Sequence, residues 1–329
     1  MGEGKAMDPL VFEPYLRPMV WGGRRLEEFG KRLHNQGHFG ESWEISGHPL
    51  HVSRVAEGPL RGRLLTDLLA SHARELYGAS PPPGRFPLLV KLLDCRDLLS
   101  IQVHPSDPLA RRLAGEEFGK TEAWVVLAAE PEGKVYAGLA AGVTRADVER
   151  GLAEGNLERC LHAVTPRPGD CLFLPAGTVH AVGGGVLLAE VQQTSDATFR
   201  LYDWNRPGPD GKPRELHVDK ALESIDWSAG PVEPAKGESL GGLPEGVRGE
   251  RLVRCRYFLL DRVRAEAPFE LPAPGHLSLW VVLTGVATLA GGGYQRAFGP
   301  GETVMAPACR DDLRWEPDGP ATLLAATLP

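Results

Sequence analysis

The sequence has few cysteines and no long apolar run. Its five cysteines stand far apart with no CxxC pair, which argues against a zinc ribbon or a redox pair and favours buried free thiols. No stretch reaches the ~18 consecutive apolar residues needed to span a bilayer, and the first residues lack the apolar core of a signal peptide. These absences predict a cytoplasmic protein that does not act at a membrane.

Basic residues are also in the minority. The 329 residues include 36 Lys and Arg against 43 Asp and Glu, so the formal net charge is −7. A negatively charged chain is not expected to bind polyanions in general. Nucleic acid is therefore not an expected partner. The apolar content of 42% and charged content of 24% fit a globular chain, long enough for two domains or one large one.

Helical periodicity is scarce, whereas turn residues are abundant, with 40 Gly and 29 Pro. Apolar spacing predicts helices over 63–76, 107–117 and 144–161, the last with Thr144 as N-cap and Asp147 in the capping-box position. Elsewhere short apolar or alternating runs are broken by Gly and Pro, which is typical of strands. The sequence therefore predicts a mainly β fold with a few added helices.

The stretch from 228 to 249 is rich in Gly, Pro and Glu and has no periodicity. It predicts a linker at 231–249 between a catalytic, metal-binding domain at 1–230, which carries the helical insertions, and a small β domain at 250–329.

A short motif occurs in both halves. The first copy follows the pattern G-x5-P-x-G-x2-H and contains Gly169, Pro175, Gly177 and His180. The second copy keeps only Gly301 and Pro307. A strand leading to Pro suits the rim of a barrel, and the pattern resembles the second signature motif of the cupin superfamily. The resemblance implies two cupin-type jelly-roll β-barrel domains, of which the second is degenerate because it lacks the His.

Polar residues gather at the ends of several predicted strands. In LSIQVHPSD, Gln102 and His104 are two apart and face the same side of a strand, as do Lys120 and Glu122 in GKTEAW. Gln102, His104 and Glu122, together with His180, form a mixed nitrogen and oxygen set that suits a divalent cation such as zinc. A solvated strand face remains the alternative interpretation.

A further group indicates an anionic ligand. Glu190 lies in the apolar run VLLAEVQQ, and Arg200 follows in FRLYDWNR. The planar charge of an arginine near a metal suits a phosphate or a developing oxyanion, and Lys212 and Arg214 add two more cations. An edge-facing Glu and a solvated basic loop are the alternatives.

Five ordered motifs together resemble the type I mannose-6-phosphate isomerases in their short bacterial form: FGESWEISGHP, LSIQVHPSD, GKTEAW, LPAGTVHAV and FRLYDWNR. The resemblance implies a zinc enzyme that interconverts mannose 6-phosphate and fructose 6-phosphate through an enediol(ate), with one zinc ion per chain. The implied metal ligands are Gln102, His104, Glu122 and His180.

The resemblance also implies roles for the remaining residues. Arg200 matches the essential arginine of the family, Ser100 matches a serine at its phosphate site, and Lys212 or Arg214 is the nearest counterpart of a phosphate-binding lysine. For the proton carrier, Glu190 is favoured because its apolar strand faces the expected pocket, with Lys120 as a relay or orienting group.

Two other functions stay open at this point. A metal-dependent cupin oxygenase would use two His and one carboxylate with open positions, and a fourth ligand in Gln102 argues against it. A non-enzymatic sugar-phosphate sensor would need an effector segment, and no helix-turn-helix or basic segment is visible. The oligomeric state is not indicated by the sequence.

Overall fold

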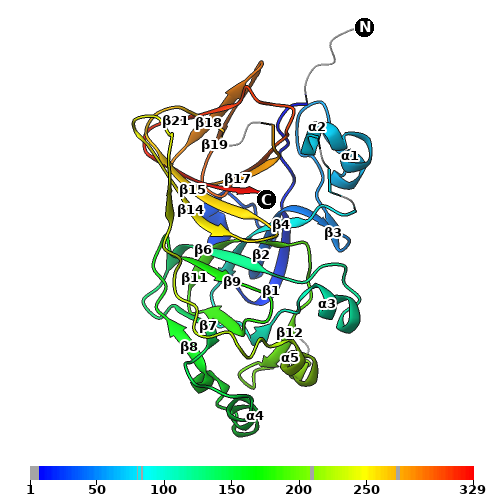
Figure 1. Cartoon of the computed structure of the whole chain (residues 1–329), viewed down its shortest axis with the longest axis vertical. Coiled ribbons are helices and arrows are strands. Elements are labelled where there is room, and N and C mark those ends of the chain that lie inside the picture. Colours follow the sequence, from blue (N-terminus) through cyan, green and yellow to red (C-terminus); the bar gives the residue numbers. More distant parts are fainter. Residues whose placement is uncertain (1–6, 80, 83, 208–210, 272–274) are drawn as a thin grey trace.

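The strands form antiparallel sheets that are grouped into two units (Figure 1). The computed structural model describes residues 7–79, 81–82, 84–207, 211–271 and 275–329. Each unit contains two sheets, as the prediction of two cupin-type jelly-roll domains requires. The prediction of a mainly β chain with a few added helices is confirmed.

The first unit is built from a seven-stranded and a five-stranded sheet. The larger sheet contains β1 (Tyr15–Gly23), β2 (Phe39–His48), β4 (Leu88–Cys95), β11 (Val186–Gln193), β6 (Glu122–Ala129) and β9 (Cys171–Leu174) in spatial order, with β3 (His51–Val52) paired to β2. The smaller sheet contains β12 (Phe199–Tyr202), β5 (Ile101–Val103), β10 (His180–Gly183), β7 (Lys134–Leu139) and β8 (Leu161–Val164).

The second unit is built from a six-stranded and a four-stranded sheet. The larger contains β13 (Glu238–Leu240), β14 (Val247–Arg254), β15 (Leu259–Ala265), β22 (Ala321–Thr327), β17 (Ser278–Thr284) and β20 (Thr303–Ala306). The smaller contains β16 (Phe269–Glu270), β21 (Arg314–Pro317), β18 (Ala287–Gly291) and β19 (Tyr294–Phe298). The core between the two sheets contains aliphatic side chains together with several aromatic rings, among them Trp280 and Trp315 at 5.7 Å between centroids.

One apolar cluster joins the two units. Leu88 and Val90 of β4 belong to the same buried cluster as Leu279 of β17 and Met305 of β20. The segment predicted as a linker, 231–249, contains β13 and the start of β14, which are strands of the second unit. Because the two units share part of their core, the structure does not show whether each folds on its own. The predicted domain boundaries therefore stay a prediction.

The helices lie outside the sheets. Those within 107–154 and 218–224 lie along the first unit, whereas the helical segment 65–77 lies beside the second unit (Figure 1), where Ala308 N–H donates to the carbonyl of Leu76 at 2.9 Å. The helix predicted over 63–76 is divided into α1 (Leu65–Ser71) and α2 (Ala73–Tyr77), because His72 between them has the non-helical torsions φ −135° and ψ 31°. The helix predicted over 107–117 is α3 (Asp107–Leu113). The structure also contains η1 (Arg25–Phe29) and α5 (Val218–Ser224), which the sequence patterns did not predict.

The helix predicted over 144–161 is α4 (Arg145–Glu154) followed by the 3-10 turn η2 (Leu157–Cys160). The predicted capping box is confirmed, since Asp147 N–H donates to Thr144 Oγ1 and the Asp147 carboxylate accepts from Thr144 N–H. The helix is shorter than predicted because Gly155 adopts a left-handed conformation, φ 69°, which ends it.

Among the residues that the structure describes, no helix has the length and apolar character that crossing a bilayer requires.

Candidate active site

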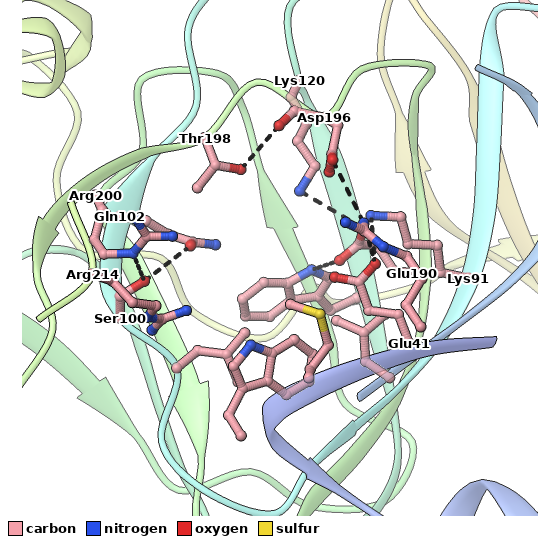
Figure 2. A pocket seen from close by; sticks show the side chains of 16 residues that line it. Glu41, Lys91, Ser100, Gln102, Lys120, Glu190, Asp196, Thr198, Arg200 and Arg214 are labelled. Atoms are coloured by element: carbon pink, nitrogen blue, oxygen red, sulfur yellow. Dashed lines mark hydrogen bonds and ion pairs between the residues drawn. The ribbon is translucent and has the colours of Figure 1, made fainter. Parts of the chain in front are cut away.

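A cavity of about 260 Å³ lies in the first unit, lined by residues of both its sheets (Figure 2). Three carboxylates line it, from Glu41, Glu190 and Asp196. They are outnumbered by the cations of Arg17, Lys91, Lys120, Arg200 and Arg214. The cavity therefore favours an anionic ligand, although the chain as a whole has a net charge of −7.

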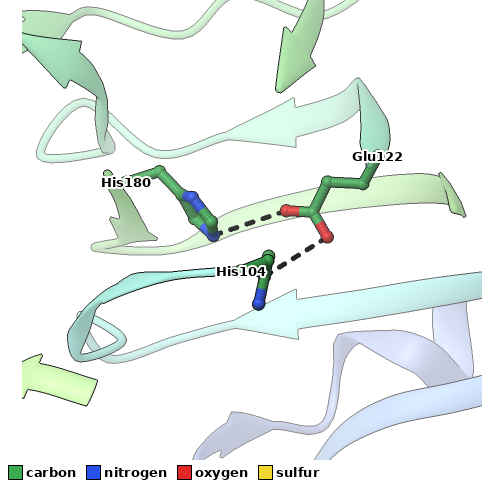
Figure 3. A group of neighbouring side chains, drawn as sticks. All are labelled: His104, Glu122 and His180. Carbon is green, nitrogen blue, oxygen red and sulfur yellow. Dashed lines mark ion pairs between the residues drawn. The ribbon is translucent and has the colours of Figure 1, made fainter. Parts of the chain in front are cut away.

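Next to the cavity, three of the predicted metal ligands form a buried cluster (Figure 3). The possible ligand atoms of His104, Glu122 and His180 all lie within 4.8 Å of one another. His104 Nε2 is 3.5 Å from one carboxylate oxygen of Glu122, and His180 Nε2 is 3.4 Å from the other. The fourth predicted ligand, Gln102, lies beside them with its amide nitrogen 3.3 Å from His180 Nε2.

Strand pairing brings these residues together from distant parts of the sequence. His180, the first residue of β10, is paired with Gln102 of β5. The turn that leads to β10 needs Gly177, whose φ of 95° lies in the left-handed region that glycine adopts readily. The N–H of Gly177 donates to the carbonyl of His104 at 2.8 Å, so the turn is fixed to the backbone of another member of the cluster.

Both imidazoles are held in the same tautomer. His104 Nδ1 is 2.9 Å from the carbonyl of Ala197, and His180 Nδ1 is 2.8 Å from the carbonyl of Thr178. A carbonyl can only accept a hydrogen bond, so each Nδ1 carries a proton and donates it. Each Nε2 consequently presents its lone pair to the cluster, as in protein sites where His binds a metal.

The surroundings of Glu122 also favour the binding of a positively charged ion. Its Oε1 is buried and accepts no hydrogen bond from the residues that the structure describes. The ammonium of Lys120 lies 2.6 Å from Oε2 of Glu122 and 3.0 Å from Nε2 of His104, so this donor set already attracts a positive charge. Two neutral imidazoles, a carboxylate and an amide are donors that suit zinc.

Burial and neighbouring charges control protonation in this cluster. Burial and the Lys120 charge lower the pKa of His104 to about 4. Burial also lowers the pKa of His180. Burial alone would raise the pKa of Glu122, but the charge of Lys120 outweighs it and holds that pKa well below its usual range. At neutral pH the cluster therefore holds a carboxylate and two uncharged rings, which are the protonation states of metal ligands.

The predicted proton carrier, Glu190, lies on β11 in a row of buried charges. Its Oε1 is 3.3 Å from the ammonium of Lys91 and 3.8 Å from that of Lys120. Trp124 Nε1–H donates to its Oε2 at 3.0 Å. The carboxylate is therefore fixed against one wall of the cavity and linked to the metal-ligand cluster through Lys120.

The predicted anion-binding residues lie at the opposite wall (Figure 2). Arg200 donates from Nε to Ser100 Oγ at 3.2 Å and from Nη1 to the carbonyl of Glu215 at 2.7 Å. Burial and the nearby charge of Arg214 lower the pKa of Arg200. Arg214 lines the cavity, whereas Lys212 is exposed and is not among the lining residues.

Sequence reasoning missed several charged residues of the cavity. Arg17 donates to Glu41 at 3.0 Å and forms an ion pair with Asp196 at 3.5 Å. Trp43 Nε1–H also donates to Glu41, at 2.6 Å. A signal for Lys91 was present, because a lone Lys inside the apolar run FPLLVKLLD has no place in a fully apolar core. No comparable local signal marked Arg17.

Comparisons with known proteins agree with this geometry. Residues 14–123 match the family model described as phosphomannose isomerase type I, catalytic domain. The chain is 34% identical over 300 residues to mannose-6-phosphate isomerase ManA of Bacillus subtilis, covering 91% of this chain and 93% of that protein. It is 32% identical over 320 residues to mannose-6-phosphate isomerase of Streptococcus mutans, covering 97% and 98%.

A solved structure shows the same relationship in three dimensions. The crystal structure of the mannose 6-phosphate isomerase from Bacillus subtilis aligns with a TM-score of 0.89 at 31% identity, and the match covers 97% of this chain and 99% of that one. Since relatives above 30% identity match over nearly their whole length, the chain belongs to the type I phosphomannose isomerase family.

Proposed function

We propose that this protein interconverts D-mannose 6-phosphate and D-fructose 6-phosphate, as a metal-dependent aldose-ketose isomerase. The observation that supports this most is the buried cluster of His104, Glu122 and His180 beside a cavity in whose lining the cations outnumber the carboxylates. The names of the relatives supply the substrate, and the cavity has the charge that a sugar phosphate requires.

One zinc ion per chain would be held by Gln102, His104, Glu122 and His180. The matched tautomers of the two imidazoles and the unsatisfied oxygen of Glu122 support this assignment. Bound there, zinc would supply Lewis-acid polarisation of the sugar carbonyl. The side chains of the protein orient the substrate and move the proton.

Glu190 carries the proton between C1 and C2 of the sugar in this proposal. Its Oε2 is held by Trp124, and Lys91 and Lys120 compensate its charge when it is ionised. Lys120 also contacts Glu122 and His104, so it can orient the substrate oxygen next to the metal ligands. The side chain of Glu190 is only 2% exposed, which would limit loss of the proton to solvent.

Ser100, Arg200 and Arg214 form the anion-binding end. Because Nε and Nη1 of Arg200 already donate to protein oxygens, the guanidinium is held in one orientation. It can bind the phosphate or the charge that develops on the enediolate. Of the two predicted loop cations, the position of Arg214 in the cavity wall favours it over Lys212.

The test is an assay of fructose 6-phosphate formation from mannose 6-phosphate, before and after removal of metal with a chelator and re-addition of zinc. We expect turnover that disappears with the metal and returns with zinc. Metal-loaded protein that forms no fructose 6-phosphate would refute the proposal and favour a sugar-phosphate sensor. Oxygen consumption with an organic substrate would favour the oxygenase. The family membership argues against both.

A cytoplasmic location and the absence of nucleic-acid and membrane partners remain predictions from the sequence. The expected partner is a small sugar phosphate.

A further inference from the structure

Asp107, the last residue of the LSIQVHPSD motif, does not line the cavity. Its carboxylate accepts four hydrogen bonds. Its side chain is 18% exposed and lies at the start of α3. Its two carboxylate oxygens face different parts of the molecule. Oδ1 accepts from the first unit, and Oδ2 accepts from Tyr257 and Arg256 of the second unit. Asp107 therefore links the two units directly.

On the side of the first unit, the contacts of Asp107 hold the segment that carries Lys120. Gly119 N–H donates to Oδ1 at 2.8 Å, and Gln193 Nε2 donates to the same oxygen at 2.9 Å. Gln193 in turn accepts from Thr121 N–H at 2.9 Å, and its own N–H donates to the Thr121 carbonyl at 3.1 Å. Both chain neighbours of Lys120 are thus fixed through Asp107.

The backbone around Gly119 is in close contact with the backbone of residues 105–107. A Cβ added at Gly119 would lie 2.6 Å from the carbonyl oxygen of Pro105 and 2.7 Å from the backbone nitrogen of Asp107. Lys120 N–H donates to the carbonyl of Pro105 at 3.1 Å. The segment with Lys120 and Glu122 is therefore packed directly against the residues that follow His104.

On the side of the second unit, the Tyr257 hydroxyl is the main contact. It donates to Oδ2 of Asp107 at 2.8 Å, while its ring packs against the apolar cluster shared by both units. Arg256 reaches the same oxygen at 3.1 Å, but its side chain is 70% exposed, so this ion pair contributes little. A hydrogen bond to a charged acceptor, made from a packed ring, is the stronger restraint.

We infer that Tyr257 is a positioning residue for the metal-ligand cluster and for Lys120, acting through Asp107 and Gln193. The second unit, which offers no metal ligand of its own among the described residues, thereby contributes to the site in the first unit. This inference rests on the proposed function for its effect on turnover, but its effect on metal binding is independent of the reaction.

The test is the variant Tyr257→Phe in the full-length protein, which removes the hydroxyl and keeps the ring. Zinc affinity of the metal-free protein is measured by competition with a chromophoric chelator. We expect binding weaker by about three- to tenfold, below the 10- to 100-fold typical when a direct partner of a ligand is lost. We also expect kcat to fall by a similar factor, with KM changed by less than about twofold.

Tyr294→Phe is the matched control. It removes a hydroxyl of the same unit whose oxygen is buried without a hydrogen-bond partner among the described residues, and it should leave zinc affinity and kcat unchanged. A second variant, Asp107→Asn, is measured alone and combined with Tyr257→Phe. It tests whether the effect of Tyr257 on the cluster passes through Asp107. If Tyr257 acts through Asp107, the double variant binds zinc no more weakly than Asp107→Asn does.

Zinc affinity and kcat of Tyr257→Phe equal to those of wild type would overturn the inference, as would fully additive losses in the double variant. Wild-type protein that binds zinc but forms no fructose 6-phosphate would refute the proposed function. The comparison of zinc affinities would still decide whether Tyr257 positions the cluster.

Discussion

Lys91 and Glu190 lie directly opposite each other on the neighbouring strands β4 and β11, with ammonium and carboxylate 3.3 Å apart. Their side chains are only 3% and 2% exposed. Taking two charges out of water costs several kcal/mol per ion, and their attraction does not always repay it. Stability alone therefore does not explain this pair, and we propose that it is retained for the proton-carrier role of Glu190.

The first prediction concerns this pair. Lys91→Met leaves the buried carboxylate of Glu190 with the more distant Lys120, so we expect unfolding free energy to fall by about 3 kcal/mol in urea denaturation. The double variant Lys91→Met/Glu190→Gln should regain most of that loss, because Glu190 no longer carries a charge and Glu41, which also lies 3.9 Å from Lys91, keeps its ion pair with Arg17 at 3.0 Å. A single variant as stable as wild type would show that Lys120 suffices to compensate Glu190.

The second prediction concerns the metal. His104→Ala and His180→Ala should each lower zinc well below one ion per chain after dialysis, measured by elemental analysis, since each removes a ligand. Gln102→Ala should weaken zinc affinity and so test the fourth ligand separately. His162→Ala is the control, because His162 pairs with Glu233 outside the cluster. Wild-type zinc content in both His variants would make the ligand assignment wrong.

The third prediction concerns pH. Burial alone would raise the pKa of Asp203, but hydrogen bonds from Arg214 and Arg206 outweigh it and hold the pKa below the usual 3.8. An acid whose folded pKa is depressed stabilises the fold above its unfolded pKa, and that contribution is lost as pH falls through the folded value.

We therefore expect the stability difference between wild type and Asp203→Asn to be constant above about pH 5 and to shrink as the pH falls below about 4. Chemical denaturation at a series of pH values measures it. A difference that persists unchanged or grows in acid would mean that the charge of Asp203 does not contribute in this way.

Local patterns predicted the parts of this molecule that local forces determine. Thr144 and Asp147 are three residues apart, and the capping box that they form needs no other part of the chain. The two-residue spacing of Gln102 with His104 and of Lys120 with Glu122 predicted that each pair would face one side of a strand. All four residues do meet at the metal-ligand cluster, although His104 and Lys120 lie just outside β5 and β6. A family resemblance then connected these local groups into one site.

Contacts between distant segments could not be predicted in this way. Lys91 lies in an apolar run, and only the pairing of β4 with β11 brings it opposite Glu190. Asp107 and Tyr257 are separated by 150 residues, so nothing in the spacing of either motif indicates their hydrogen bond. The helix over 144–161 was predicted too long because apolar spacing continues past Gly155, whose left-handed conformation ends α4.

The last prediction concerns Arg200, which contacts Ser100 and is paired in register with Gln102. If Arg200 stabilises charge that develops only in the enediolate, Arg200→Ala should lower kcat by about 10²-fold, which corresponds to about 3 kcal/mol, and KM should change less. Arg200→Lys should recover little, since a point charge on a flexible stem does not reproduce two fixed donors. Zinc content should stay unchanged, because Arg200 is not a ligand.

Steady-state kinetics with mannose 6-phosphate separate this role from simple phosphate binding. A group that binds the phosphate equally in the ground and transition states raises KM when it is removed and leaves kcat intact. Arg214→Ala provides the comparison, because Arg214 lines the same end of the cavity and is held by Asp203 rather than by Ser100. We expect its loss to act mainly on KM. If Arg200→Ala changed KM alone, Arg200 would belong with Arg214 as a phosphate clamp, and charge stabilisation would have to come from the metal ligands' side of the cavity.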